Sequence, residues 1–250
     1  MEQNPIIKIS NLVKRYPNTY KPAIDGLNLN IYPGEIFGLL GPNGAGKTTT
    51  ISMLCTHLKP DKGSIIINGK ELSSHQTAIR KEIGFVPQDI ALYDKLTARE
   101  NLLFFGNMYG MKGKMLTEKI DFWLNTFGLR EKSGKQIKTY SGGMKRRVNL
   151  MAGLLHEPKI LFLDEPTVGI DVQSKNIIIE SLKEVNKKGT TIIYTSHHMD
   201  EAEHFCSRIA IIDYGKIIAK GKPEVLINEC VGCENLESIF LKLTGRKLRD

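Results

Sequence analysis

The stretch Gly41-Pro42-Asn43-Gly44-Ala45-Gly46-Lys47-Thr48 decides the fold of this 250-residue chain. It follows an apolar run at residues 36–40 and precedes a helix-like segment at residues 49–58. The pattern G-x-x-x-x-G-K-T between a strand and a helix predicts a phosphate-binding loop, because glycines let successive N–H groups point at phosphate oxygens. The start of the helix adds its own unpaired N–H groups and the positive end of its dipole. We therefore expect the chain to bind a nucleoside triphosphate.

Two side chains complete this predicted loop. Lys47 is placed to reach the terminal phosphates, and the Thr48 hydroxyl is placed to bind Mg²⁺. Thr49, the next residue, is included among those expected to bind the nucleotide. The predicted cofactors are thus ATP and Mg²⁺.

The composition predicts a globular chain with a sizeable core, since 41% of its residues are hydrophobic and 25% are charged. No apolar segment approaches the ~18–20 residues that a membrane-spanning helix needs. Residues 1–5 lack the charged and apolar regions of a signal peptide. We expect a cytosolic chain forming one nucleotide-binding domain over residues 1–250.

The chain is basic, with a net charge of +8. Such a charge attracts anionic lipids or nucleic acid, but scattered lysines are more typical of a soluble surface, so no nucleic-acid partner is expected. The basic tail at residues 246–249 could touch a membrane surface, although fraying in solvent is the simpler expectation. Among the four cysteines, Cys230 and Cys233 form a lone C-x-x-C, which lacks the second pair that zinc requires. We expect this pair to be reduced.

Strand-like and helix-like segments alternate along the chain, which predicts an α/β fold with a mainly parallel sheet. Further short strands are expected at residues 6–9, 23–31 and 64–67, the last of them followed by a hairpin turn at Asn68-Gly69. Residues from about 92 to 150 read as an inserted helical subdomain, which a capping box at residues 97–100 opens. Residues 224–250 form a short C-terminal extension. The basic residues Lys145, Arg146 and Arg147 read as a solvated helix face.

Polar residues follow two of the predicted strands. Asp164 and Glu165 end a buried apolar run, at the edge of an α/β sheet where ligands bind. Beside a phosphate loop, Asp164 is expected to hold Mg²⁺ and Glu165 to orient and activate the attacking water. His197 and His198 end another strand, and one of them could contact the γ-phosphate or Glu165. Upstream of the loop, Tyr16 could stack on an adenine ring.

Taken together, these motifs resemble the ATP-binding cassette (ABC) ATPase family over residues 6 to about 223. The motifs that carry the resemblance are Tyr16, the loop Gly41 to Thr48, Gln88, Ser141-Gly142-Gly143, residues 160–165, Gly169-Ile170-Asp171 and His197. The fold implied is a P-loop NTPase core with an antiparallel β subdomain and a helical subdomain.

The resemblance also implies roles for individual residues. Tyr16 would stack on adenine, and Lys47 would hold the β- and γ-phosphates together with the loop N–H groups. Thr48, Gln88 and Asp164 would surround Mg²⁺.

For catalysis, the resemblance makes Glu165 the general base and His197 the γ-phosphate contact, with Lys47 and Gln88 completing the catalytic set. His197 is preferred over His198 because it directly follows the Thr-Ser end of its strand.

The remaining residues imply a dimer. Ser141, Gly142 and Gly143 would contact the γ-phosphate of ATP held by a second subunit, and Asp171 would lie between the two active sites. Two ATP molecules would close the dimer and hydrolysis would let it open. The family signature usually reads Leu-Ser-Gly-Gly-Gln, whereas Met144 takes the last place here and cannot form the hydrogen bonds of Gln.

The function implied is an ATP-hydrolysing transporter subunit. Residues 92–106 are similar to cassettes that serve multidrug and ABC-2-type exporters. We expect a homodimer on the cytoplasmic face of the membrane, driving export through a separately encoded permease. Two alternatives stay open: a cassette acting on nucleic acid or ribosomes, and a regulator with little turnover, which would require Glu165 to be idle.

Overall fold

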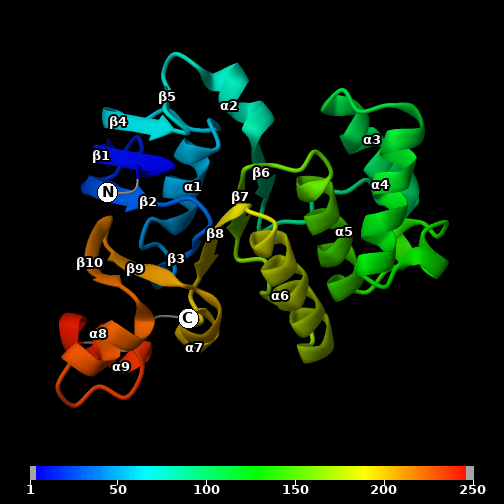
Figure 1. Cartoon of the computed structure of the whole chain (residues 1–250). Helices are drawn as coiled ribbons and strands as arrows, with labels where there is room; N and C mark the ends of the chain where they lie inside the picture. Colours follow the sequence, from blue (N-terminus) through cyan, green and yellow to red (C-terminus); the bar gives the residue numbers. More distant parts are fainter. Residues whose placement is uncertain (1–3, 246–250) are drawn as a thin grey trace. The chain divides into compact units, whose positions relative to one another are not determined.

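The computed structural model describes residues 4–245 of the chain. The sequence-based expectations for residues 1–3 and for the basic tail at 246–249 lie outside this range. The described chain divides into two compact units, one built from residues up to 80 and from 191 onward, the other from residues 81–190 (Figure 1). No helix within residues 4–245 is both long enough and apolar enough to span a bilayer.

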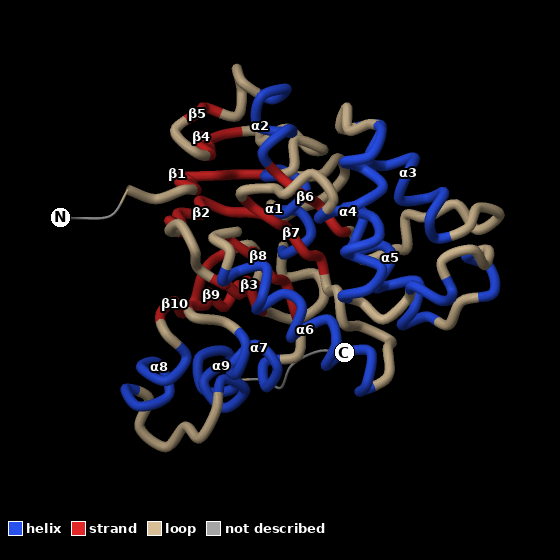
Figure 2. The backbone as a smooth tube through the Cα atoms, turned by 45° about the vertical axis from the view of Figure 1, so that its right-hand side comes forward, coloured by secondary structure: helices blue, strands red, loops and turns tan. Residues whose placement is uncertain are grey.

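An antiparallel sheet opens the first unit, with the strand order β2-β1-β4-β5 (Figure 2). Its strands are β1 (Ile7–Lys14), β2 (Ile24–Ile31), β4 (Lys62–Ile67) and β5 (Lys70–Glu71). Buried and more exposed residues alternate along β2, as expected when one face of a sheet covers the core. Asn68 and Gly69 have φ values of 48° and 74°, which confirms the predicted hairpin turn between β4 and β5.

The first unit also contains parallel strands. The strand β3 (Ile36–Leu40) lies between β8 (Thr191–Ser196) and β9 (Arg208–Asp213), and β10 (Lys216–Gly221) pairs with β9 in the antiparallel sense. Every residue of β3 and β8 is buried, which explains the continuous apolar sequence of β3 and the apolar centre of β8. Leu40 pairs with Ser196, so the residues that follow β3 and β8 emerge together at one edge.

Within the described residues, short helices accompany these strands. They are α1 (Lys47–Leu54), α2 (Gln76–Glu82), α7 (Met199–Phe205), α8 (Pro223–Glu229) and α9 (Leu236–Thr244). The helix α2, which runs across the boundary between the units, is absent from the sequence-based expectations because its single buried residue, Ile79, gives no helical period.

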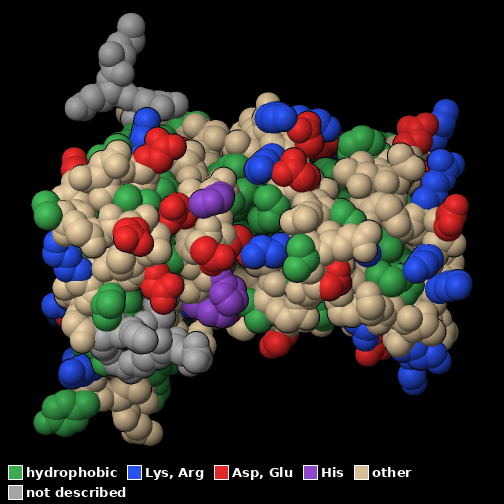
Figure 3. Space-filling model, turned by 90° about the horizontal axis from the view of Figure 1, so that it is seen from below, with side chains coloured by type: hydrophobic (Ala, Val, Ile, Leu, Met, Phe, Trp, Pro, Cys, Tyr) green, Lys and Arg blue, Asp and Glu red, His purple; other side chains and the backbone are tan. Residues whose placement is uncertain are grey.

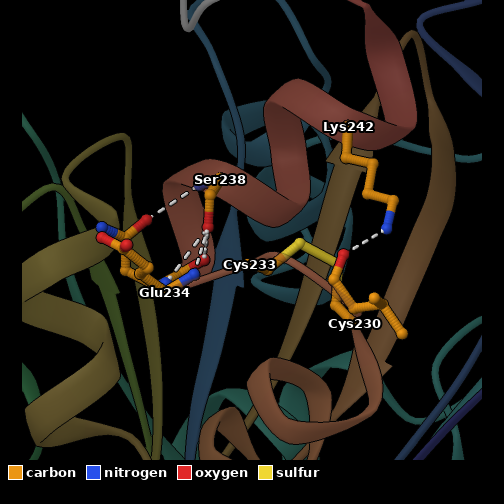
Figure 4. The surroundings of a disulfide bond; sticks show 7 residues. Cys230, Cys233, Glu234, Ser238 and Lys242 are labelled. Atoms are coloured by element: carbon orange, nitrogen blue, oxygen red, sulfur yellow. Dashed lines mark hydrogen bonds between the residues drawn. A yellow bond between two sulfur atoms is a disulfide. The ribbon is translucent and has the colours of Figure 1, made fainter.

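The turn between α8 and α9 corrects one expectation. Cys230 and Cys233 form a disulfide in the structure, not a reduced pair (Figure 4). The turn at Gly232, with φ of 78°, brings their Cα atoms to 5.4 Å, within the normal range for a disulfide. Lys242 of α9 donates a hydrogen bond of 2.6 Å to the Val231 carbonyl in the same turn.

In the second unit, β6 (Ile83–Val86) and β7 (Ile160–Asp164) pair in parallel. Its helices are α3 (Ala98–Met108), α4 (Gly113–Thr126), α5 (Gly142–Leu154) and α6 (Val172–Lys187), with 3₁₀ turns at Arg130–Lys132 and Ile137–Thr139. The predicted capping box of α3 is confirmed: Thr97 Oγ1 accepts from the Glu100 N–H, and Glu100 Oε2 accepts from the Thr97 N–H at 2.8 Å. The predicted limits of a helical subdomain, about 92 and 150, stay predictions.

The helix α5 packs against β6 with backbone close to backbone. A Cβ atom added to Gly84 of β6 would lie 2.3 Å from the carbonyl oxygen of Gly153 in α5. A Cβ atom on Gly153 would in turn lie 2.7 Å from a methyl group of Val86. Such close packing leaves no space for the helix to move against the strand, so α5 and β6 form a rigid pair.

Candidate nucleotide-binding and hydrolysis site

The segment between β3 and α1 folds as a tight loop around its own backbone. Gly46 has φ of 113°, and a Cβ atom there would lie 2.7 Å from the carbonyl oxygen of Ala23. A Cβ atom on Gly41 would lie 2.2 Å from the carbonyl oxygen of Ile212. Only glycine fits these two positions, which accounts for two of the glycines in the motif.

Lys47 begins α1 directly after this loop, and its side chain is only 4% exposed. Its ammonium group donates to the carbonyl oxygens of Gly41 at 2.8 Å and Pro42 at 3.2 Å. The cation is therefore held against the loop, beside N–H groups at the start of α1 that receive no side-chain cap. A helix start without a cap, next to a buried cation, is suited to an anion.

Three further residues predicted for this site lie close to the loop in the first unit. The Tyr16 and Thr49 hydroxyl groups share a hydrogen bond of 3.2 Å, although they are far apart in the sequence. Tyr16 remains 40% exposed, so its ring is accessible to a flat ligand. His197 directly follows Ser196, whose carbonyl oxygen accepts from the Gly41 N–H at 3.3 Å. His198 instead begins α7 as its N-cap residue and is exposed.

The second unit gathers the predicted acidic residues and Gln88. Asp164 and Glu165 are 2% and 5% exposed. Because β6 and β7 are parallel and Val86 pairs with Leu163, their carboxyl ends bring Gln88 and Glu165 together. The Gln88 side-chain amide donates to Glu165 Oε2 at 3.3 Å. This arrangement holds a buried carboxylate beside an amide, which suits a base that must be oriented.

The backbone at Glu165 lies in the left-handed region, with φ of 47°. A non-glycine residue costs about 1–2 kcal/mol in that conformation. Strain of this kind is concentrated at functional sites, where the surrounding structure over-determines it. The sequence motif gives no sign of this conformation.

The predicted signature residues lie at the start of α5, also in the second unit. Ser141 is the N-cap residue, and its hydroxyl accepts from the Met144 N–H at 3.3 Å. A Cβ atom on Gly143 would lie 2.2 Å from Ser174 Oγ, so Gly143 allows the starts of α5 and α6 to meet. Asp171 caps α6 by accepting from the Ser174 N–H at 2.8 Å, and this hydrogen bond lowers the pKa of the Asp171 carboxyl.

The expectation of a solvated basic face after Ser141 is wrong for Arg146. Arg146 is buried, and its guanidinium donates to the backbone carbonyls of Gln88 and Pro87. The run of three basic residues gives no sign of this contact, because the burial of Arg146 depends on carbonyl acceptors from a segment distant in sequence. The available signal would have been that Arg146 lies on the same helical face as the apolar Leu150, four residues further along α5.

The predicted magnesium ligands fit the chemistry of the ion. Mg²⁺ prefers oxygen donors and is commonly held by one or two carboxylates together with substrate phosphates. Thr48 supplies a hydroxyl, Gln88 an amide oxygen and Asp164 a carboxylate at a strand end. Residues 4–245 contain no cluster of three or more acidic, His or Cys side chains that would hold a metal without a substrate.

A phosphate loop between a buried parallel strand and a helix, within an α/β fold, defines a P-loop nucleotide-hydrolysing protein. The family model described as ABC transporter matches residues 24–168. The chain belongs to this family and is an ATP-binding and ATP-hydrolysing ABC subunit.

Relatives and solved structures agree with this assignment. The chain is 47% identical over 227 residues to the linearmycin resistance ATP-binding protein LnrL of Bacillus subtilis (strain 168), covering 91% of this chain and 72% of that protein. It is 42% identical over 217 residues to the Nod factor export ATP-binding protein I of Paraburkholderia xenovorans (strain LB400), covering 87% and 71%. A dimeric ATP-binding cassette in a post-hydrolysis state with ADP and Pi superposes with a TM-score of 0.78, at 29% identity, covering 86% of this chain and 98% of that one.

The left-handed backbone at Glu165 leads to a stability test. Asn tolerates this conformation better than Gln, and both replacements remove the charge. We expect Glu165→Asn to be more stable than Glu165→Gln, by up to ~1 kcal/mol in the free energy of unfolding. Urea titration of both variants measures the difference.

The same pair of substitutions at Glu118 provides the control, since this residue lies within α4. There Gln is the better helix former and should be the more stable variant. Equal or reversed stability of the Glu165 pair, with the expected order at Glu118, would contradict the strain at Glu165.

Proposed function

We propose that this chain is one of two ATPase subunits that power an exporter through a separate membrane subunit. The relatives are named for linearmycin resistance and for Nod factor export, and both names describe an ATP-binding protein. The similarity covers most of the chain in both cases, which supports a shared role in export. The chain would act at the cytoplasmic face of the membrane, as a peripheral subunit.

The nucleotide is proposed to bind as the family resemblance implies. Tyr16 stacks on the adenine, and the loop N–H groups with Lys47 hold the β- and γ-phosphates. The contact between Tyr16 and Thr49 supports this, since it brings the aromatic ring to the helix that follows the loop. Mg²⁺, held by Thr48, Gln88 and Asp164, would neutralise charge on the phosphate oxygens.

For hydrolysis, Glu165 is proposed to accept a proton from the attacking water while His197 contacts the γ-phosphate. The observation that carries this proposal is the buried Glu165 carboxylate beside the Gln88 amide. A carboxylate fixed by a hydrogen bond and by its backbone is oriented before substrate arrives, which is what a general base requires.

The dimer is proposed to form head to tail around two ATP molecules. Ser141 and Gly142 are exposed at the start of α5, so this helix start is accessible to a phosphate from outside the chain. The similar cassette solved with ADP and Pi is dimeric, which supports a composite site. Met144 leaves the backbone contacts of the signature unchanged, because they depend on N–H groups and not on its side chain. Asp171 would lie between the two sites.

A nucleic-acid or ribosomal role is the less favoured alternative. Figure 3 shows one face of the molecule, on which Lys and Arg side chains lie in small groups among acidic ones. A surface that tracks a phosphate backbone is normally a continuous basic stripe. The lysines are also scattered along the sequence, so we attribute the net charge of +8 to solubility.

The catalytic assignment is tested by Glu165→Gln and Lys47→Ala. Glu165→Gln should keep ATP binding and lower kcat by roughly 10²-fold or more, because it removes the base. Lys47→Ala should lose ATP binding itself. Equilibrium binding of a labelled ATP analogue and steady-state hydrolysis separate the two effects.

Normal turnover of Glu165→Gln would remove Glu165 from its proposed role. ATP binding by Lys47→Ala at the wild-type affinity would remove Lys47 from the phosphate site.

The transport assignment is tested by purifying the tagged chain from mild detergent extracts of its own cells. An integral membrane protein should copurify with the chain in stoichiometric amount. The same protein should copurify equally well with the Lys47→Ala variant. Recovery of nucleic acid or ribosomes, with no membrane protein, would favour the alternative.

A further inference from the structure

Arg146 of α5 holds the backbone that leads to the proposed catalytic residues. It is 7% exposed, and its Nη1 atom donates to the carbonyl oxygens of Gln88 and, at 3.3 Å, of Pro87. Its Nε atom is buried and has no hydrogen-bond partner within the described chain. Burial lowers the pKa of this guanidinium, and the charge of Asp89 opposes that shift.

A buried cation with an unsatisfied N–H group is a costly way to fill a core position. Apolar side chains of similar volume often serve a purely structural site as well or better. The contacts of Arg146 are to backbone oxygens of one short segment, so its effect is to fix the path of residues 87–88.

Asn149 lies three residues further along α5, on the same face of the helix. Its Oδ1 atom accepts from the Ala91 N–H at 3.2 Å, and its Nδ2 atom lies 3.5 Å from the Pro87 carbonyl oxygen. Together, Arg146 and Asn149 attach residues 87–91 to α5 at both ends of the segment. If α5 shifts, residues 87–91 should shift with it.

This attachment bears on the hydrolytic site because Gln88 contacts Glu165. With its carbonyl held by Arg146, the Gln88 side chain extends to Glu165 Oε2 at 3.3 Å. A shift of the Gln88 backbone would lengthen this bond and release the Glu165 carboxylate. Misplacement by about 1 Å can lower a rate by 10²-fold.

The other end of α5 is the serine-capped helix start. Arg146 lies about 8 Å along the helix axis from Ser141, at about 1.5 Å per residue. The Gly84–Gly153 contact and the Gly143–Ser174 contact fix α5 at both ends, so it moves as a rigid body. One helix thus carries both the proposed phosphate contact and the attachment of Gln88.

We propose that Arg146 is a positioning residue that ties the orientation of Glu165, through Gln88, to the placement of α5. The inference rests on the proposed roles of Glu165 and Ser141. Through Arg146, the orientation of the base depends on where α5 lies, and α5 is the helix whose start is proposed to meet the phosphate of the second subunit. Arg146 itself touches neither the nucleotide nor the attacking water.

The test compares Arg146→Met, Arg146→Lys and Arg99→Met in the full chain. Met removes both donors while keeping side-chain length, and we expect kcat to fall by roughly 10- to 100-fold with KM for ATP within about twofold. Lys keeps one donor group and should recover part of the loss. Arg99 pairs instead with Asp121 between α3 and α4, and its loss should change kcat less than about twofold.

A double-mutant cycle with Gln88→Ala identifies the route of the effect. If Arg146 acts through Gln88, Arg146→Met should lower kcat in the wild type but by less than about twofold in the Gln88→Ala chain. Thermal unfolding of all variants is measured in parallel to show that they are folded at the assay temperature, and a purely structural role would lower kcat by the same factor in both backgrounds.

An unchanged kcat in Arg146→Met, or an equal fold-loss in both backgrounds, would overturn the proposal. If Arg146→Met does not fold, the same cycle is measured with Arg146→Lys. A fall in kcat that occurs only in the chain that keeps Gln88 would support the proposal. Failure of the proposed function would appear separately, as normal turnover of Glu165→Gln whatever Arg146 does.

Discussion

The first N–H groups of an α-helix have no acceptor within the helix, and the function proposed for this chain depends on how it uses two such helix starts. At α1 the N-cap residue is Gly46, which offers no side-chain acceptor, and the buried ammonium of Lys47 adds positive charge beside the loop. At α5 the Ser141 hydroxyl accepts from a single N–H group and leaves the helix start exposed. Side chains of their own segments also cap α3 and α6, so α1 differs from these three helices in having no side-chain cap.

Around these helix starts, several side chains are held in fixed positions that lower the stability of the fold. Asp164 and Glu165 are buried acids, Glu165 has a left-handed backbone, and Arg146 is a buried cation with an unsatisfied nitrogen. Each of these features is unfavourable by itself. They lie within the second unit at the ends of β6 and β7 and along α5, where the glycine contacts make the framework rigid enough to hold them.

Much of this architecture can be predicted from the sequence. The phosphate loop, the buried strand before Asp164, the Asn68-Gly69 turn and the capping box at Thr97 depend on local patterns, and each is present in the structure. The proximity of Tyr16 and Thr49, and of Gln88 and Glu165, also agrees with the expected site.

The features that were missed cannot be read from the local sequence pattern. Arg146 reads as solvated because its acceptors belong to Pro87 and Gln88, and the disulfide of Cys230 depends on the turn geometry at Gly232. The backbone of Glu165 could not be foreseen, since no residue type in the motif demands a positive φ. Local pattern specifies the elements, whereas tertiary acceptors decide which charges are buried.

Sedimentation velocity in the presence of ATP tests most directly whether two chains share a composite site. The mass is measured for the Glu165→Gln variant and for the double variant Glu165→Gln, Ser141→Arg. The account predicts a dimer holding two nucleotides for Glu165→Gln, and a monomer that still binds ATP with unchanged affinity once Ser141 is also replaced. A dimer that persists with Ser141→Arg, or a loss of ATP affinity in that monomer, would contradict it.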